Sequence, residues 1–222
     1  MLKIESMHFY KTIFVLLIMF TNSKLFSYEE GIALNGDLEI YYRDYGPKDA
    51  EPILLVQGIG GQLINWPEHL IDFLLENNFR PIVYDNRDTG LSSRIPSDSF
   101  SDAKRDNTIV RNYIRYYLRL PIKSDYTLDD MAVDGISVLD KLDISEAHIL
   151  GISMGGMIAQ IIVSSHPERT KTFTLISSTA STPSPFNGPT RKVRKLLMNR
   201  TKNPNSTVDE RVARSRKIFT EI

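Results

Sequence analysis

The order of apolar and polar residues predicts a hairpin followed by a buried strand. Residues 38–45 alternate between apolar and polar positions, and residues 31–37 before them end in an Asn-Gly turn signal. Together they predict two antiparallel strands, which Gly46 and Pro47 terminate. Residues 52–56 are apolar throughout, as expected of a strand that is buried on both faces of a sheet.

Beyond this strand, helical and strand-like segments alternate. Apolar spacing predicts a helix over 66–76, and Thr127 with Asp130 three residues later predicts a capped helix that runs to about residue 142. The other predicted elements are strands over 80–84, 147–150 and 171–176, a buried helix over 157–163, and a loop with one helix in residues 94–126. This order is typical of an α/β fold with a doubly wound, mostly parallel sheet, an N-terminal antiparallel hairpin and helices on both faces.

One turn in this pattern carries candidate chemistry. Gly151, Ser153 and Gly155 form a G-x-S-x-G pattern between the predicted strand over 147–150 and the helix after it. In a strand–turn–helix context this pattern is the nucleophile elbow, in which a strained turn lifts the serine hydroxyl above the sheet. The glycines allow strand and helix to approach closely, and the N-terminus of the helix favours an anion. Ser153 is therefore a candidate nucleophile, and an ordinary glycine-rich turn is the alternative.

The composition narrows the function classes. The chain has 222 residues, of which 41% are hydrophobic and 24% charged, and this suits one globular domain or slightly more. Its formal net charge is zero, so no basic excess points to a nucleic acid. It contains no cysteine, which excludes disulfides, thiolate metal ligands and a cysteine nucleophile. No motif implies a metal or an organic cofactor, so neither is expected.

The N-terminus has the order of a secretory signal. Lys3 and Lys11 precede an apolar run over 13–20, and polar residues follow it. The run is too short to span a bilayer, which needs about 20 residues. Residues 1–27 are therefore expected to direct export to the periplasm or out of the cell. An uncleaved membrane anchor and a wrongly assigned start codon are the alternatives.

The C-terminal part differs in composition from the predicted core. Residues 28–182 are expected to form that core, and residues 183–222 to begin a helical lid. Within the lid segment, residues 191–198 are basic and amphipathic. They are expected to form a solvated helix, and a helix that binds a membrane surface or an anionic partner is the alternative.

Four features together resemble the α/β-hydrolase family: the hairpin, the loop over 57–60, the polar loop over 85–90 and the G-x-S-x-G turn. The similarity spans roughly residues 31–180 and is strongest to the aclacinomycin methylesterase-like esterases of that family. The resemblance implies a serine hydrolase that cleaves a small-molecule carboxylic ester through an acyl-enzyme. It also implies a partial form of the family's eight-stranded sheet, with six strands and the strand over 171–176 exposed along one edge.

The resemblance also implies an oxyanion hole. In this family two backbone N–H groups form it, and they map to Ile59 and Met154. Acyl transfer creates an alkoxide, and donors that are aimed at it stabilise the transition state. Gln57 stands where many members have a histidine that is not the catalytic base, so this departure leaves the implied activity in place.

The base that a serine nucleophile needs is not evident in the chain. The family places an acid and then a histidine after later strands, and the chain reaches Ile222 before either is expected. His148 and His166 are predicted to lie about 16 Å and about 18 Å from the serine, at the far ends of a strand and a helix. His69 is the least excluded histidine, and a packed or surface role is expected for each of the three.

The polar loop over 85–90 offers two carboxylates near the predicted site. Asp85 and Asp88 follow the strand over 80–84, and they are expected to cap the loop and to pair with Arg87.

Three functions remain open. The chain is the N-terminal part of an exported serine esterase whose triad is completed by residues outside it, or it is a non-catalytic, hydrolase-like binding protein. The third is a membrane-anchored, lipase-like protein that uses its basic segment over 191–198 at a lipid surface.

Overall fold

A six-stranded mixed sheet organises the protein, in the order β1-β2-β4-β3-β5-β6. The computed structural model describes residues 27–95, 115, 118, 120 and 124–179. The strands are β1 (Glu29–Asn35), β2 (Leu38–Asp44), β3 (Glu51–Val56), β4 (Phe79–Tyr84), β5 (Ala147–Ile152) and β6 (Thr170–Ile176). Strand β2 pairs antiparallel with both β1 and β4, and β4, β3, β5 and β6 run parallel to one another. The predicted fold class, an α/β sheet with an N-terminal antiparallel hairpin, is confirmed.

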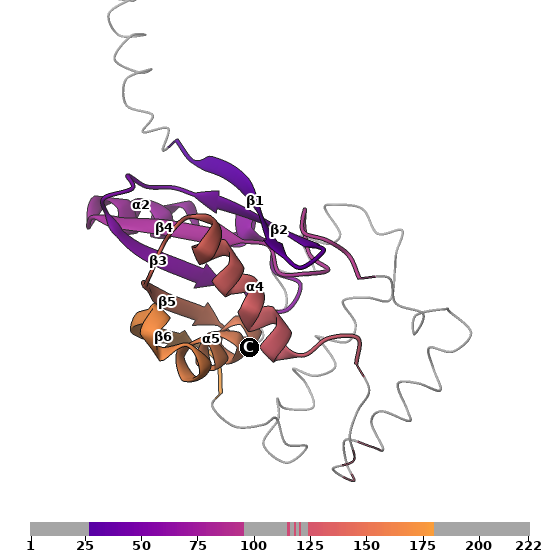
Figure 1. The fold of residues 1–222 in the computed structure, drawn as a ribbon. Helices are drawn as coiled ribbons and strands as arrows, with labels where there is room; N and C mark the ends of the chain where they lie inside the picture. The colour runs from indigo at the N-terminus through magenta and orange to yellow at the C-terminus, as the bar shows by residue number, and fades with distance from the viewer. Residues whose placement is uncertain (1–26, 96–114, 116–117, 119, 121–123, 180–222) are drawn as a thin grey trace, which may run out of the picture.

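Helices cover both faces of this sheet. Figure 1 shows α4 (Leu128–Lys141) and α5 (Met154–Ser165) in front of the strands, whereas α2 (Glu68–Glu76) lies behind them. Two hydrophobic clusters match this arrangement. Leu54 and Val56 of β3 belong to the cluster under α4 and α5, and Ile53 and Leu55 belong to the cluster under α2. The strand is therefore buried on both faces, as its apolar run predicts.

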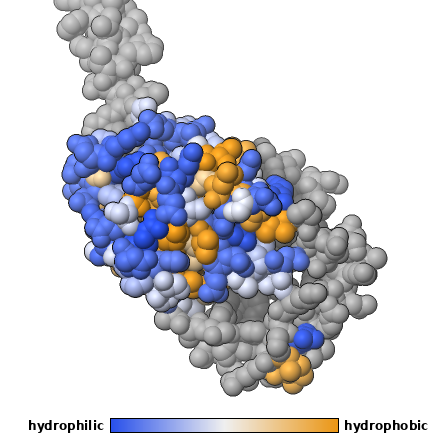
Figure 2. Space-filling model, in the orientation of Figure 1, coloured by the Kyte–Doolittle hydropathy of each residue, from blue (hydrophilic) through white to orange (hydrophobic). Residues whose placement is uncertain are grey.

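The outer surface of the helices is polar. Figure 2 shows that hydrophilic side chains cover most of the described part of the face in front, with smaller apolar patches between them. This is the pattern of amphipathic helices that turn their apolar sides to a sheet.

The hairpin turn differs from the Asn-Gly turn that the sequence predicts. Asn35 pairs with Leu38, so Gly36 and Asp37 form the two-residue loop. Gly36 has a φ of 61°, and a glycine with positive φ at the first loop position fits a type II′ turn. Asn35 remains paired in β1, and its side chain donates a hydrogen bond of 2.8 Å to Asp134 on α4.

The predicted capping box at the start of α4 is confirmed. Thr127 Oγ1 accepts a hydrogen bond of 3.2 Å from the Asp130 backbone N–H. In return, Asp130 Oδ2 accepts one of 2.7 Å from the Thr127 backbone N–H. Two donors that the helix itself leaves unpaired are satisfied in this way.

Two predicted helix starts need correction. The helix predicted over 66–76 begins only at Glu68, because a 3-10 turn, η1 (Leu63–Asn65), and Pro67 precede it. The helix predicted over 157–163 begins at Met154, directly after Ser153. The glycines after the serine hide this early start, because glycine is a poor helix former.

Strand β6 is an edge strand within the described residues, as predicted. It pairs with β5, and a short 3-10 turn, η3 (Pro167–Arg169), leads into it. Phe173, Leu175 and Ile176 are each 37% to 39% exposed. An apolar edge of this kind is a site where other chains can pair.

Several predicted segments lie outside the described residues. They are the N-terminal segment up to residue 26, most of residues 94–126, and the lid segment over 183–222. Among the helices that are described, none has the length and apolar character to cross a membrane.

Candidate active site

Ser153 occupies a strained turn between β5 and α5. Its backbone has a φ of 55° and a ψ of −122°, a conformation that costs an L-residue about 1–3 kcal/mol. Its N–H donates to the Ile176 carbonyl at 3.0 Å, and its carbonyl accepts from the Gly156 N–H at 3.0 Å. The side chain is exposed at the carboxyl end of the sheet. This is the strand–turn–helix geometry that the sequence predicts around Ser153.

The two glycines of the pattern are required by close backbone approach. A Cβ on Gly151 would meet the carbonyl oxygen of Gly155, and a Cβ on Gly155 would meet the carbonyl oxygens of Val56 and Gln57. These obstacles are backbone atoms, which cannot rotate away. The first turn of α5 therefore packs directly against the end of β3 and against the turn itself.

The loop after β3 reaches Ser153. A Cβ on Gly58 would lie 3.2 Å from Ser153 Cβ and 3.7 Å from Ser153 Oγ. Ile59, the next residue, is 73% exposed. The structure therefore brings the predicted donor loop and the candidate nucleophile together.

The two candidate oxyanion donors are available in the described part of the chain. Gly58 O accepts a hydrogen bond of 3.0 Å from Gly61 N, whereas the N–H groups of Ile59 and Met154 donate to no described residue. Met154 opens α5, and the partial positive charge at a helix N-terminus favours an anion there.

Asp85 and Asp88 cap loops, as predicted. The buried Asp85 accepts hydrogen bonds from Leu63 N at 2.7 Å and from Leu91 N at 2.9 Å. Asp88 accepts one from Ile95 N at 2.7 Å. Asp85 thereby ties the loop after β3 to the loop after β4.

The predicted pairing of these carboxylates with Arg87 is wrong. Arg87 forms a two-pronged ion pair with Asp134 of α4, with distances of 2.6 Å from Nε to Oδ2 and 2.7 Å from Nη2 to Oδ1. Asp134 is fully buried and needs a charged partner, whereas the backbone N–H groups of Leu63 and Leu91 already satisfy Asp85. The guanidinium also lies 5.3 Å from the ring centre of Tyr126, whose pKa is raised to about 12, chiefly by burial and further by Asp88.

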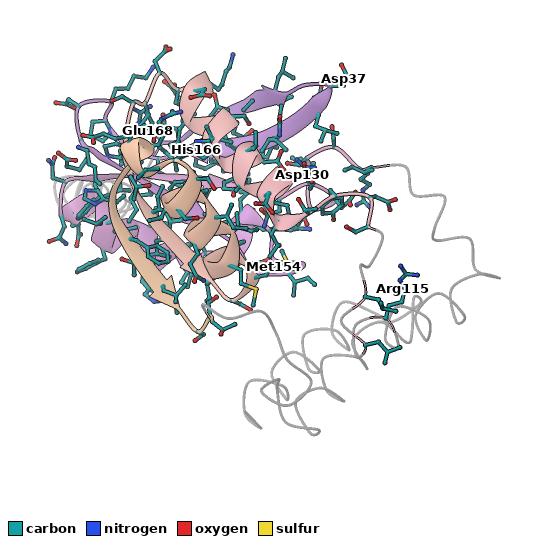
Figure 3. The ribbon with its side chains drawn as sticks, turned by 60° about the horizontal axis from the view of Figure 1, so that its bottom comes forward. Asp37, Arg115, Asp130, Met154, His166 and Glu168 are labelled. Atoms are coloured by element: carbon teal, nitrogen blue, oxygen red, sulfur yellow. The ribbon has the colours of Figure 1, made fainter. Side chains whose placement is uncertain are left out.

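None of the three described histidines is hydrogen-bonded to Ser153. His148 lies at the amino end of β5, where Nδ1 is 2.7 Å from Thr172 Oγ1 and Nε2 is 3.7 Å from Glu51. His166 caps the far end of α5 and lies 3.8 Å from Glu168. Figure 3 shows His166 and Glu168 at the end of α5 opposite to Met154.

His69 is exposed in the first turn of α2 and forms no hydrogen bond with the described residues around Ser153. The packed or surface roles expected of the histidines therefore hold for those in the described residues. No group of three His, Asp or Glu side chains is gathered as metal ligands within the described ranges.

Sequence reasoning missed two polar residues that organise the site, the buried Asp134 and the partly exposed Gln160. Asp134 bonds Arg87 and Asn35, and its signal was a carboxylate on the apolar face of a helix, between Met131 and Val138. Gln160 of α5 donates to the Gly156 carbonyl at 3.1 Å and to the Thr179 carbonyl at 2.9 Å, which fixes the loop after β6. No sequence pattern indicates that second contact, because it joins residues without a shared periodicity.

Comparisons with known proteins agree with this geometry. The model of the alpha/beta hydrolase fold family matches residues 51–218. The rhodomycin D methylesterase DnrP of Streptomyces peucetius is 30% identical over 158 residues, which are 71% of this chain and 41% of DnrP. The rhodomycin D methylesterase DauP of Streptomyces sp. (strain C5) is 32% identical over 130 residues, or 59% of this chain and 35% of DauP.

A solved structure agrees on the fold. The 2-hydroxy-6-oxo-6-phenylhexa-2,4-dienoate hydrolase from Rhodococcus superposes with a TM-score of 0.58 at 19% identity, covering 80% of this chain and 55% of that one. The chain spans 35% to 41% of the length of the two methylesterases. The predicted resemblance to methylesterase-like α/β-hydrolases is confirmed. Because the family model covers well over half of the chain and the sheet has the expected architecture, the chain belongs to the alpha/beta hydrolase fold family.

Proposed function

We propose that this chain supplies the nucleophile and the oxyanion hole of a serine esterase that acts on a small-molecule carboxylic ester. The observation that carries this proposal is the strained backbone of Ser153, exposed at the carboxyl end of β5 with Gly58 packed beside it. Strain of this kind persists where surrounding structure holds it, and it clusters at active sites. The similarity to two methylesterases supports an ester as the substrate class.

The proposed reaction has two steps. Ser153 Oγ attacks the ester carbonyl carbon, its proton passes to a base, and the alcohol leaves with a proton to give an acyl-serine. Water then attacks the acyl-serine and releases the carboxylic acid and the free serine. In both steps the N–H groups of Ile59 and Met154 are proposed to bind the oxygen that becomes negative, and removal of one such donor typically lowers the rate about 100-fold or more.

The base and its acid are proposed to come from residues other than those described. The described histidines lie at strand and helix ends that are remote from Ser153 or are exposed on α2. That placement also favours the second candidate, a non-catalytic binding protein that retains the hydrolase fold. In the binding protein Ser153 would keep its backbone strain but would not become acylated.

Covalent trapping separates these candidates. The protein is incubated with a fluorophosphonate, and the peptide that contains residues 151–156 is analysed by mass spectrometry. The control is Ser164→Ala, because Ser164 is an exposed serine on α5. An adduct on Ser153 that is lost in Ser153→Ala but kept in Ser164→Ala supports the esterase. Absence of any adduct from the protein in its natural form supports the binding protein.

We also propose that residues 1–27 direct export. Lys3 and Lys11 with the apolar run over 13–20 support this. N-terminal sequencing of the protein from the periplasm or medium tests it: a new N-terminus near residue 28 is expected, and an intact Met1 on cytoplasmic protein contradicts it.

A further inference from the structure

A buried amide contacts the loop that carries the proposed oxyanion donor. Asn86 directly follows β4 and is 1% exposed. Its Nδ2 donates a hydrogen bond of 3.0 Å to the carbonyl oxygen of Gln57. Because a carbonyl oxygen only accepts, the NH2 side of the amide must face Gln57.

The Gln57 carbonyl shares its peptide plane with the Gly58 N–H, one residue before the proposed donor. The Gln57 carbonyl is also pressed against α5, since a Cβ on Gly155 would clash with it. The next carbonyl, that of Gly58, accepts from Gly61 N at 3.0 Å. In a planar trans peptide the N–H points away from the C=O, so the Ile59 N–H is directed away from Gly61.

The residue before Asn86 holds the other end of the same loop. Asp85 Oδ1 accepts a hydrogen bond of 2.7 Å from Leu63 N. Two consecutive side chains after β4 therefore fix both ends of residues 57–63. Gly58 lies beside Ser153 between these two anchors.

The amide oxygen of Asn86, Oδ1, indicates why this position is an asparagine. This oxygen is buried and has no hydrogen-bond partner among the described residues. An unpaired buried acceptor is costly, and a leucine of nearly the same shape would avoid that cost. The benefit of the asparagine must then lie in its donor, which bonds the Gln57 carbonyl.

We propose that Asn86 is a positioning residue that orients the Ile59 N–H toward the oxyanion site. It does so by fixing the Gln57–Gly58 peptide, from which the Gly58–Ile59 peptide continues, and it makes no contact with substrate. The catalytic part of this role rests on the proposed function, whereas the structural part does not.

The test uses Asn86→Leu, which keeps the shape of the side chain and removes both polar atoms. The matched control is Asn65→Leu, which removes an exposed asparagine that bonds Gln62 N at 2.7 Å in the same loop. In 15N NMR spectra of the full chain, the Gly58 and Ile59 amide signals are expected to move or split in Asn86→Leu and to stay in place in Asn65→Leu. If Asn86→Leu does not fold, Asn86→Ala replaces it.

Two further measurements distinguish positioning from a purely structural role. The unfolding temperature of Asn86→Leu is expected to stay near that of the wild type, because loss of the unpaired Oδ1 offsets the Gln57 carbonyl that is left without its donor. In the naturally produced protein, kcat for an ester is expected to fall about 100-fold, the typical cost of a small misplacement, with KM little changed. The rate with the matching thionoester should fall much less, because sulfur is a weak acceptor.

The outcomes separate the two proposals. Unchanged Gly58 and Ile59 signals in Asn86→Leu, or equal losses of rate with the ester and the thionoester, overturn the role of Asn86. Absence of Ser153-dependent hydrolysis in the wild type overturns the proposed function instead, and the NMR result still decides whether Asn86 orients Ile59.

Discussion

The backbone N–H of Ser153 donates a hydrogen bond of 3.0 Å to the carbonyl oxygen of Ile176, the last residue of β6. The strained turn is therefore held by the neighbouring strand as well as by its own glycines. Gln160 fixes the chain just beyond β6 through Thr179, which keeps that end of the strand in place. The position of Ser153 thus depends on β3, β5, β6 and α5 together.

Substitution of Gly155 should damage this arrangement. In Gly155→Ala the new Cβ meets backbone oxygens of Val56 and Gln57, so the free energy of unfolding is expected to fall by about 3 kcal/mol. Gly36→Ala is the control, because its Cβ meets nothing within 4 Å and only its φ of 61° is unfavourable, at about 1–2 kcal/mol. Urea denaturation measures both. A smaller loss for Gly155→Ala than for Gly36→Ala would show that the close contact is unimportant.

The buried ion pair between Arg87 and Asp134 should contribute far more than an exposed one. Asp134→Asn leaves the Arg87 charge buried, and the expected loss in unfolding free energy is about 3–5 kcal/mol. Asp140 lies on the same helix as Asp134, and Asp140→Asn breaks its 2.6 Å pair with Arg169 of η3, for an expected loss below about 1 kcal/mol.

The contrast follows from burial, since the side chain of Asp134 is 0% exposed and that of Asp140 is 59% exposed. Chemical denaturation of both variants measures it. Equal losses would contradict a special role for the Arg87 pair.

The capping box makes stability depend on pH. Hydrogen bonds from the side chain and backbone of Thr127 hold the pKa of Asp130 below the ordinary aspartate value. The folded state therefore binds fewer protons than the unfolded state, so this contribution is present above the ordinary aspartate pKa and is lost as the pH falls through the folded pKa.

Carboxyl titration by NMR measures that shift directly. Thr127→Val removes the hydroxyl and should raise the Asp130 pKa toward its ordinary value, whereas Asp129→Asn, in the same turn, should change it much less. An Asp130 pKa that Thr127→Val leaves unaltered would argue against the capping box as its cause.

The 222-residue chain by itself is expected to hydrolyse p-nitrophenyl butyrate no faster than its Ser153→Ala variant. A serine hydroxyl without a base is a weak nucleophile, and the chain has four histidines. Two of them lie at remote element ends, His69 is exposed on α2, and His8 lies in the predicted signal. Turnover that Ser153→Ala abolishes would point to His69, and His69→Ala would then identify it.

Local patterns predicted much of this structure. The apolar run of β3, the capping box of α4 and the glycine spacing around Ser153 each depend on residues that are close in sequence. The match of the family model and the order of the sheet agree with what those patterns indicate.

Long-range polar contacts were not predictable in the same way. Arg87 was expected to pair with its neighbours Asp85 and Asp88, but it bonds Asp134, 47 residues away. Asn35 was assigned to a turn, but it pairs with Leu38 in β1 and its side chain bonds Asp134. Arg87 pairs with Asp134 because that carboxylate is fully buried on α4 and a buried charge must be paired.

The central claim is that Ser153 is the nucleophile of an ester hydrolase. Its most direct test is the rate of p-nitrophenyl butyrate hydrolysis by the protein as its own cells produce it, compared with the same protein carrying Ser153→Ala. The account predicts a loss of at least about 1,000-fold in kcat in the variant, since nothing else in the site replaces the attacking hydroxyl. A rate that is unchanged in Ser153→Ala would contradict it.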